Sequence, residues 1–305
     1  MSGFPQIIVL TGPTASGKTA IARRLLERFP ELTLISCDSR KVYRFMDIGT
    51  AKPPPELRRH YRLIDIRMPD ETYSAQDFAL DAEREIKKAL ESGSIPLVVG
   101  GTILYLKALF EGFFESPPIE ESVREKLRER LEKEGPAALY DELQKIDPET
   151  AAKVHPNDWF RIIRALEVFY QTGKPISVVR RENQRQPMFR PVYFFNAMPR
   201  PQLYERINRR VDVMMERGFL DEVRNLMEMG YDLSLPSMNT LGYRELYLHL
   251  QGKMDLETAV RLTKKRTRTF ARRQFYFSRS LKGIRYVPPE EIFDALVAAI
   301  ESCYA

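Results

Sequence analysis

The hydrophobic positions of this chain form short unbroken runs near its start and helical repeats further along. Four of the runs have the length of strands that are covered on both faces of a parallel sheet. These runs are residues 7–10, 32–36, 95–99 and 192–196. A helical repeat follows the first run, and another is expected from Ser74 to Ser92, with Ser74 and Asp77 in capping-box positions. Strands that alternate with helices predict an α/β fold with a parallel sheet flanked by helices.

The pattern changes at about residue 120. Helix signals then follow one another, including prolines at helix starts (Pro136 and Pro148), and no strand candidate interrupts residues 120–189. The apolar run at 192–196 returns to strand character. We therefore expect residues 1–119 and 190–305 to form one core domain and residues 120–189 to form an all-helical insertion domain.

The first apolar run leads into Gly-Pro-Thr-Ala-Ser-Gly-Lys-Thr, which fits the phosphate-loop (P-loop) pattern between a strand and a helix. Its residues are Gly12, Pro13, Thr14, Ala15, Ser16, Gly17, Lys18 and Thr19. The glycines let backbone N–H groups turn toward an anion, Lys18 adds a cation, and Thr19 offers a hydroxyl to Mg²⁺. The motif predicts a P-loop NTPase-like core, but it does not specify whose phosphates are bound.

Two further candidate sites follow predicted strands at their carboxyl ends, where ligands collect in α/β sheets. Asp38 follows the second strand, and it is either a functional carboxylate or a cap of the next turn. Gly100, Gly101 and Thr102 follow the third strand. The paired glycines indicate either a close backbone approach to a ligand or a plain strand-to-helix turn.

Composition places the chain among ordinary globular proteins. Its 305 residues are 43% hydrophobic and 30% charged, and no apolar run is long enough to span a membrane. A core strand begins already at residue 7, which leaves no room for a secretory signal, so we expect a cytoplasmic protein with no membrane partner. Cys37 and Cys303 lie far apart without metal-ligand spacing and are interpreted as free thiols.

The basic residues are concentrated in helices near the end of the chain. A helix expected over about 256–279 carries eight of them, and residues 260–282 contain no acidic side chain. A run of one sign suits a phosphate backbone, whereas its interleaved aromatics are more often core residues. In an earlier helix, Arg206, Arg210 and Arg217 could face an anion or simply be solvated.

The carboxylates of a hydrolytic P-loop motor are missing. Its metal-binding strand would end in Asp, usually followed by Glu, but the strand at 95–99 ends in glycines. Asp38 is followed by Ser39 and Arg40 instead of Glu. The sequence therefore supports phosphate binding better than hydrolysis, and a diphosphate substrate other than ATP becomes a serious hypothesis.

Taken together, these blocks resemble the tRNA dimethylallyltransferase (tRNA isopentenyltransferase) family over nearly the whole chain. The matching blocks are the P-loop, Asp38-Ser39, Met46-Asp47-Ile48-Gly49-Thr50-Ala51-Lys52-Pro53, Gly100-Gly101-Thr102, His155-Pro156-Asn157-Asp158 and Gly242-Tyr243-Arg244-Glu245. The resemblance implies transfer of a dimethylallyl group from dimethylallyl diphosphate to N6 of adenosine 37 in tRNA, with release of diphosphate. The adenine would flip into a channel through the core.

The resemblance also implies roles for individual residues. Asp38 would be the general base, Thr102 and Arg210 would complete the catalytic group, the P-loop would hold the diphosphate, and Thr19 would hold Mg²⁺. Arg206 and Arg217 are alternatives to Arg210. The implied tRNA contacts are Asp38, Ser39, Arg40, Lys41, Phe160, Arg161, Ile162, Ile163, Arg164, Asn239, Thr240, Leu241, Gly242, Tyr243 and Arg244. Lys41 and Phe160 depart from the family pattern, because many members carry Gln there.

No Cys/His zinc module follows the core, so the chain resembles the compact bacterial form, which is expected to be a monomer. Three rival hypotheses remain. An adenylate isopentenyltransferase using AMP, ADP or ATP would need neither the insertion nor the basic helix. A P-loop kinase would use ATP as its donor. A non-catalytic RNA-binding module would not need Lys18, Thr19 and Asp38.

Overall fold

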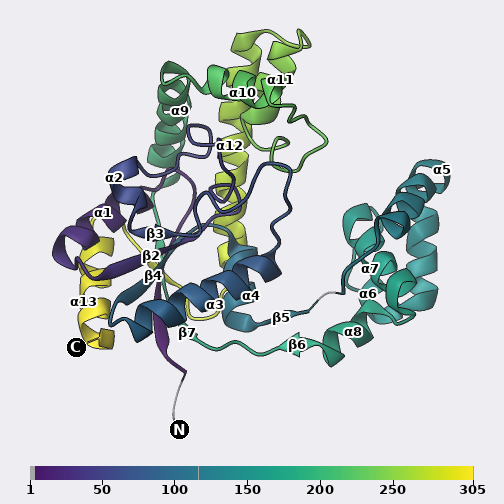
Figure 1. Ribbon diagram of the computed structural model, residues 1–305, viewed down its shortest axis with the longest axis horizontal. Helices are drawn as coiled ribbons and strands as arrows, with labels where there is room; N and C mark the ends of the chain where they lie inside the picture. Colours follow the sequence, from purple (N-terminus) through teal and green to yellow (C-terminus); the bar gives the residue numbers. More distant parts are fainter. Residues whose placement is uncertain (1–3, 116, 305) are drawn as a thin grey trace. The chain divides into compact units, whose positions relative to one another are not determined.

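The computed structural model describes residues 4–115 and 117–304, which divide into two compact units (Figure 1). The first unit combines the described residues up to Glu111 with those from Pro187 onward, and the second is Gly112–Gln186. The second unit begins before the predicted residue 120, because Phe113 and Phe114 pair with residues near its end. No helix among the described residues is long and apolar enough to cross a membrane.

The first unit is built on a six-stranded parallel sheet with the order β3-β2-β4-β1-β7-β8. The strands are β1 (Gln6–Thr11), β2 (Leu32–Cys37), β3 (Tyr61–Arg62), β4 (Ile95–Gly100), β7 (Arg190–Asn196) and β8 (Arg285–Val287). The chain thus rejoins the sheet after the second unit, where β7 pairs with β1. This arrangement confirms the predicted α/β fold with a parallel sheet.

Helices cover both faces of the sheet, and β1 shows why its apolar run is unbroken. Ile7 and Val9 pack with α3 (Ala75–Glu91) and α4 (Ile103–Glu111), whereas Ile8 and Leu10 pack with α1 (Lys18–Arg28) and α13 (Ile292–Tyr304). Successive side chains of a strand point to opposite faces, so a strand covered on both sides has no polar alternation. The predicted capping box of α3 is present at Ser74 and Asp77.

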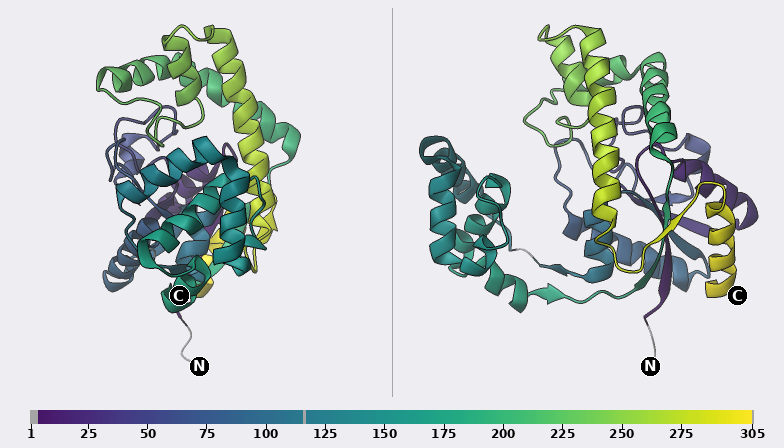
Figure 2. Two further views of the ribbon diagram at one scale, coloured as in Figure 1. Left: turned by 90° about the vertical axis from the view of Figure 1, so that its right-hand side faces the viewer. Right: turned by 180° about the vertical axis from the view of Figure 1, so that it is seen from behind.

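A second group of helices follows β7 (Figure 2). They are α9 (Arg200–Glu216), α10 (Phe219–Glu228), α11 (Tyr243–Leu250) and α12 (Leu256–Ser278). The basic helix α12 packs against α9, α11 and α4, so it bridges this group and the sheet layer. A short helix, α2 (Pro55–Arg58), follows the proline-rich loop.

The second unit has its own apolar core, which includes Leu139, Leu143 and Leu166. Its helices are α5 (Glu121–Ile146), α6 (Pro148–Ala151), α7 (Trp159–Thr172) and α8 (Ile176–Glu182). The prediction of an all-helical insertion is wrong in one detail. Strand β6 (Gln184–Arg185) pairs antiparallel with β5 (Phe113–Phe114). Two residues are too few to produce a recognisable strand period.

Candidate active site

The loops that follow β1, β2 and β4 meet in one cavity of the first unit, with a volume of about 1040 Å³. The pairing of β2 with β4 brings these loops together, because Cys37 at the end of β2 lies opposite Gly100 at the end of β4. The P-loop, Asp38 and Thr102 therefore line the same cavity, as the positions at carboxyl ends of parallel strands predict.

The P-loop is held in shape by side chains from other parts of the chain. Gly12 and Gly17 have φ values of 147° and 98°, which suit glycine. The Asn196 amide donates to the Ser16 carbonyl at 2.7 Å. Arg206 Nε donates to the Ala15 carbonyl at 3.0 Å. The loop is thus fixed at its centre before any anion binds.

Lys18 is folded back onto its own loop. Its Nζ donates to the carbonyl oxygens of Gly12 and Pro13, both at 2.8 Å. The pKa of Lys18 is lowered to about 7, chiefly by burial, with the nearby charges of Lys41 and Arg210 acting in the same direction and Asp38 in the opposite one. A bound anion would favour the charged form of this amine.

Asp38 uses one carboxylate oxygen as a turn cap. Its Oδ1 accepts from the backbone N–H groups of Arg40 at 2.9 Å and Lys41 at 3.3 Å. The capping alternative is therefore confirmed. It does not exclude a functional role, because Asp38 also lines the cavity and its second oxygen has no hydrogen bond within the described residues.

Thr102 connects the ends of β2 and β4. Its Oγ1 accepts from Ser39 N–H at 3.2 Å, and its own N–H donates to the Cys37 carbonyl at 3.3 Å. The two preceding glycines, Gly100 and Gly101, are packed so closely that a Cβ on either would clash with protein atoms. A Cβ on Gly100 would lie 2.0 Å from the Cys37 oxygen, and one on Gly101 would lie 2.5 Å from Gln274 Nε2 and 2.8 Å from the Gly12 oxygen. Close packing against protein atoms therefore accounts for both glycines, while Gly101 also lines the cavity, so a ligand contact there stays a prediction.

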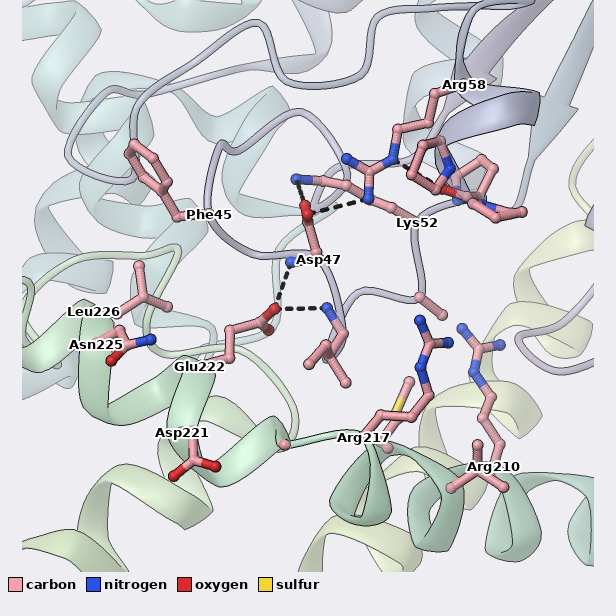
Figure 3. Close-up of a pocket in the computed structure, with 18 of the residues that line it drawn as sticks. Phe45, Asp47, Lys52, Arg58, Arg210, Arg217, Asp221, Glu222, Asn225 and Leu226 are labelled. Atoms are coloured by element: carbon pink, nitrogen blue, oxygen red, sulfur yellow. Dashed lines mark hydrogen bonds and ion pairs between the residues drawn. The ribbon is translucent and has the colours of Figure 1, made fainter.

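Two of the three candidate arginines contact the P-loop. Arg206 binds the Ala15 carbonyl, and Arg210 Nη1 lies 3.5 Å from Thr14 Oγ1. Burial lowers the pKa of Arg210, with Asp38 opposing and Arg206 adding to the shift. Arg217 lines a second cavity of about 900 Å³, which Arg210 also reaches, but not the first (Figure 3).

The described wall of the first cavity has one acidic residue, Asp38, and nine basic ones. The basic residues are Lys18, Arg40, Lys41, Lys52, Arg206, Arg210, Lys265, Arg266 and Arg273. Lys52 and Arg266 are paired with carboxylates that lie outside this wall. Burial also lowers the pKa of Lys41. An uncompensated positive charge of this size is suited to a polyanionic ligand.

The predicted tRNA contacts come from three segments of the chain, residues 38–41, 160–164 and 239–244. Residues 38–41 and 239–241 line the first cavity, whereas residues 160–164 lie on α7 in the second unit. The side chains of Ile162, Ile163 and Tyr243 are buried, so they cannot be contacted directly from solvent. Phe160, in contrast, is 70% exposed.

Sequence reasoning missed two residues at the P-loop, Asn196 and Gln274. Gln274 on α12 accepts from Thr14 N–H at 2.8 Å and donates to the Gly101 carbonyl at 3.0 Å. It lies 260 residues from Thr14, so no local pattern links the two. The signal in the sequence is weak: Gln274 follows two arginines in the basic run, and its burial is seen only in the structure.

The described residues include no group of three His, Cys, Asp or Glu side chains that could hold a metal ion. Thr19 is the one predicted metal ligand, and it lines the cavity beside Lys18. Magnesium typically binds proteins through one or two side chains together with phosphate oxygens and water. The single hydroxyl of Thr19 therefore fits a magnesium ion that is bound mainly by the oxygens of a diphosphate.

Fold and cavity together define an α/β phosphate-loop protein with a strongly cationic site, whose described wall lacks the carboxylate pair of a P-loop hydrolase. The sequence model of one family, IPP transferase, matches residues 41–281. The chain belongs to the IPP transferase family and is a transferase enzyme.

Curated relatives and solved structures agree with this assignment. The chain is 45% identical over 284 residues to the tRNA dimethylallyltransferase of Thermotoga maritima, covering 92% of both chains. It is 41% identical over 304 residues to tRNA dimethylallyltransferase 1 of Trichlorobacter lovleyi, covering 99% of both. The tRNA isopentenylpyrophosphate transferase of Bacillus halodurans superposes with a TM-score of 0.70 at 35% identity, over 99% of this chain and 98% of that one.

A eukaryotic dimethylallyltransferase acting on tRNA gives a TM-score of 0.82 at 30% identity. That match covers 97% of this chain and 78% of the eukaryotic one.

The lowered pKa of Lys18 predicts proton uptake when an anion binds. At about pH 8 the free amine is mostly neutral, and a bound diphosphate raises its pKa, so affinity for inorganic diphosphate falls as pH rises above about 7. Titration calorimetry in buffers of different ionisation enthalpy measures the uptake. Lys18→Met is the control that removes the contribution of this amine. Equal proton uptake in both proteins would contradict the prediction.

Proposed function

We propose that this protein transfers the dimethylallyl group of dimethylallyl diphosphate to N6 of adenosine 37 in tRNA and releases diphosphate. The observation that carries the proposal is one cavity in which a P-loop, a carboxylate and a half-buried arginine meet. The names of the relatives give the group transferred and the RNA acceptor. Diphosphate would be held as a leaving group, which explains why no water-activating carboxylate is needed.

In the proposed reaction, the bond between C1 of the dimethylallyl group and the diphosphate oxygen breaks while a bond from N6 to that carbon forms. Negative charge grows on the departing diphosphate, where Lys18, Arg210 and the P-loop N–H groups stabilise it. Lys18 would first exchange the carbonyls of Gly12 and Pro13 for phosphate oxygens. Mg²⁺ bound at Thr19 would supply further neutralisation of the diphosphate.

The amine of adenine is a weak nucleophile, because its lone pair is delocalised into the ring. Asp38 would accept the N6 proton as the new bond forms. The turn contacts of Oδ1 with Arg40 and Lys41 hold the carboxylate in place and leave the other oxygen for this transfer. Thr102, held by Ser39 and Cys37, would orient the amine.

The adenine must leave the stacked anticodon loop to reach such a site. Residues 38–41 and 239–241 line the cavity and would contact the flipped base and its neighbours. Exposed Phe160 and Arg161 on α7 would add contacts from the second unit. The buried side chains of Ile162, Ile163 and Tyr243 would support these contacts from behind.

One assay separates this proposal from an adenylate isopentenyltransferase or a kinase. The protein is incubated with radiolabelled dimethylallyl diphosphate and either an anticodon stem-loop RNA or AMP. We expect label on the RNA and none on AMP. Label on AMP alone would favour the adenylate isopentenyltransferase. In a parallel reaction with labelled ATP, transfer of phosphate would favour a kinase.

Replacing Asp38 tests its role as general base. Asp38→Asn keeps an oxygen that can cap the turn at Arg40 but cannot take the proton, so turnover should fall by about 10² or more. Stem-loop binding, measured by fluorescence anisotropy, should stay nearly unchanged. Asp38→Ala also removes the cap, so comparing the two variants separates the cap from the base. Normal turnover by Asp38→Asn would remove Asp38 from the proton transfer.

Five of the seven basic residues of α12 form two groups that allow a matched test of RNA binding. Lys264 is paired with Asp212 at 2.5 Å, and Arg268 donates to Asn208 at 2.5 Å. Lys265, Arg272 and Arg273 are exposed and have no acidic partner among the described residues. The second group is therefore the better candidate for binding phosphates.

Changing Lys265, Arg272 and Arg273 to Gln should weaken stem-loop binding. The slope of log affinity against log salt should become shallower by about 0.7–0.9 for each RNA phosphate that the variant no longer neutralises. The double variant Lys264→Gln/Arg268→Gln, with its charges already engaged inside the protein, should change the slope less. An equal effect in both variants would show that local partners do not decide which cations bind RNA.

A further inference from the structure

The loop of residues 45–52, called here the wall loop, separates the two cavities of the first unit. Gly49, Thr50, Ala51 and Lys52 line the first cavity, and much of the same loop also lines the second (Figure 3). Phe45 and Ala51 have φ values of 65° and 50°, a left-handed conformation that side chains rarely adopt. Such a conformation persists only where surrounding contacts impose it.

Glu222 on α10 supplies those contacts from the helical side. Its Oε2 accepts from the backbone N–H groups of Asp47 at 2.8 Å and Ile48 at 2.7 Å, and its Oε1 accepts from Gly49 N–H at 3.0 Å. The Tyr243 hydroxyl donates to Oε1 at 2.6 Å. Three successive N–H groups form an anion-binding concavity, and here the anion belongs to the protein itself.

Tight packing places the loop against the same helices. A Cβ on Gly49 would lie 2.2 Å from the Phe219 ring and 2.5 Å from the Tyr243 ring. At the other end of the loop, the buried Lys52 amine contacts Asp47 at 2.8 Å and Asp65 at 2.5 Å. Glu222 thus fixes the beginning of the wall loop and Lys52 fixes its end.

The Glu222 carboxylate also connects the wall loop to the helix that carries Arg210. Glu222 lies in the first turn of α10, which follows α9 after Arg217 and Gly218. Glu222 does not line the first cavity, so it does not touch a ligand bound there. It contacts the wall loop instead, and Gly49, Thr50 and Ala51 of that loop line the first cavity together with Arg210.

We propose that Glu222 is a positioning residue for the transfer reaction and that its three backbone contacts hold the wall loop in its catalytic position. The expected effect on the transfer rate rests on the proposed function. The claim that Glu222 holds the loop rests only on its hydrogen bonds. A loop that shifts by about 1 Å misplaces the reactants and costs on the order of 10² in rate without removing any group that binds diphosphate.

Glu222→Gln tests the proposal, because the amide keeps the size of the side chain but turns an N–H₂ group toward a backbone donor. We expect kcat for stem-loop prenylation to fall by about tenfold or more. The dissociation constant of inorganic diphosphate should change by less than about threefold. Hydrogen–deuterium exchange of the peptide covering Asp47, Ile48 and Gly49 should become faster, while the core strands keep their protection.

Asp221→Asn is the matched control. Asp221 precedes Glu222 in the same turn and lines the same second cavity, but its ion pair within the described residues is with Arg224. This variant should leave both kcat and loop exchange unchanged. In a Glu222→Ala variant, added formate should occupy the vacated concavity and restore part of kcat, which a general loss of stability would not allow.

Several outcomes would overturn the proposal. Unchanged exchange in Glu222→Gln would show that the carboxylate does not hold the loop. Faster exchange with normal kcat would show that the loop position does not matter for transfer. If Glu222→Gln does not fold, Tyr243→Phe removes one donor to the carboxylate and should give a smaller change in the same direction; no change there would also contradict the proposal. If the unmodified protein transfers no dimethylallyl group, the proposed function fails, and the exchange contrast alone decides whether Glu222 holds the loop.

Discussion

The ends of β1, β2 and β4 lie at one level of the sheet, and the site depends on that alignment. Cys37 and Gly100 face each other so closely that the Cys37 carbonyl occupies the place of a Gly100 side chain. Thr102 then ties the two strand ends together through Ser39 and Cys37. Because the three strands end together, the P-loop, a carboxylate and a hydroxyl share one cavity.

The charged side chains around this cavity determine which ligands it can bind. Desolvation lowers the pKa values of Lys18, Lys41 and Arg210, and these cations also repel one another. Asp38 compensates only part of this charge. In the free protein Lys18 rests on loop carbonyls, which accept its hydrogen bonds until a ligand can do so. A bound diphosphate would relieve repulsion that the fold otherwise has to tolerate, and this makes the site selective for a polyanion.

A P-loop by itself does not decide between hydrolysis, phosphoryl transfer and prenyl transfer, because all three present phosphates to the same N–H groups. The surroundings of the loop make the difference. Here the neighbouring strand ends carry Asp38 and Thr102, and Gln274 and Arg206 fix the loop from distant helices. In the proposed reaction, this loop therefore holds the departing diphosphate.

The sequence by itself determined the features that depend on neighbouring residues: the sheet strands with long apolar runs, the capping box of α3, the P-loop and the position of Asp38 at a strand end. Only the tertiary structure decided what distant residues do, because their contacts join positions far apart in the chain. Glu222 meets Asp47 across 175 residues, and Gln274 meets Thr14 across 260. Which cations of α12 are already paired, as Lys264 is with Asp212, depends on helix packing. Short-range spacing records the preferences of a segment, whereas the partners of a charge are fixed only when the segments pack together.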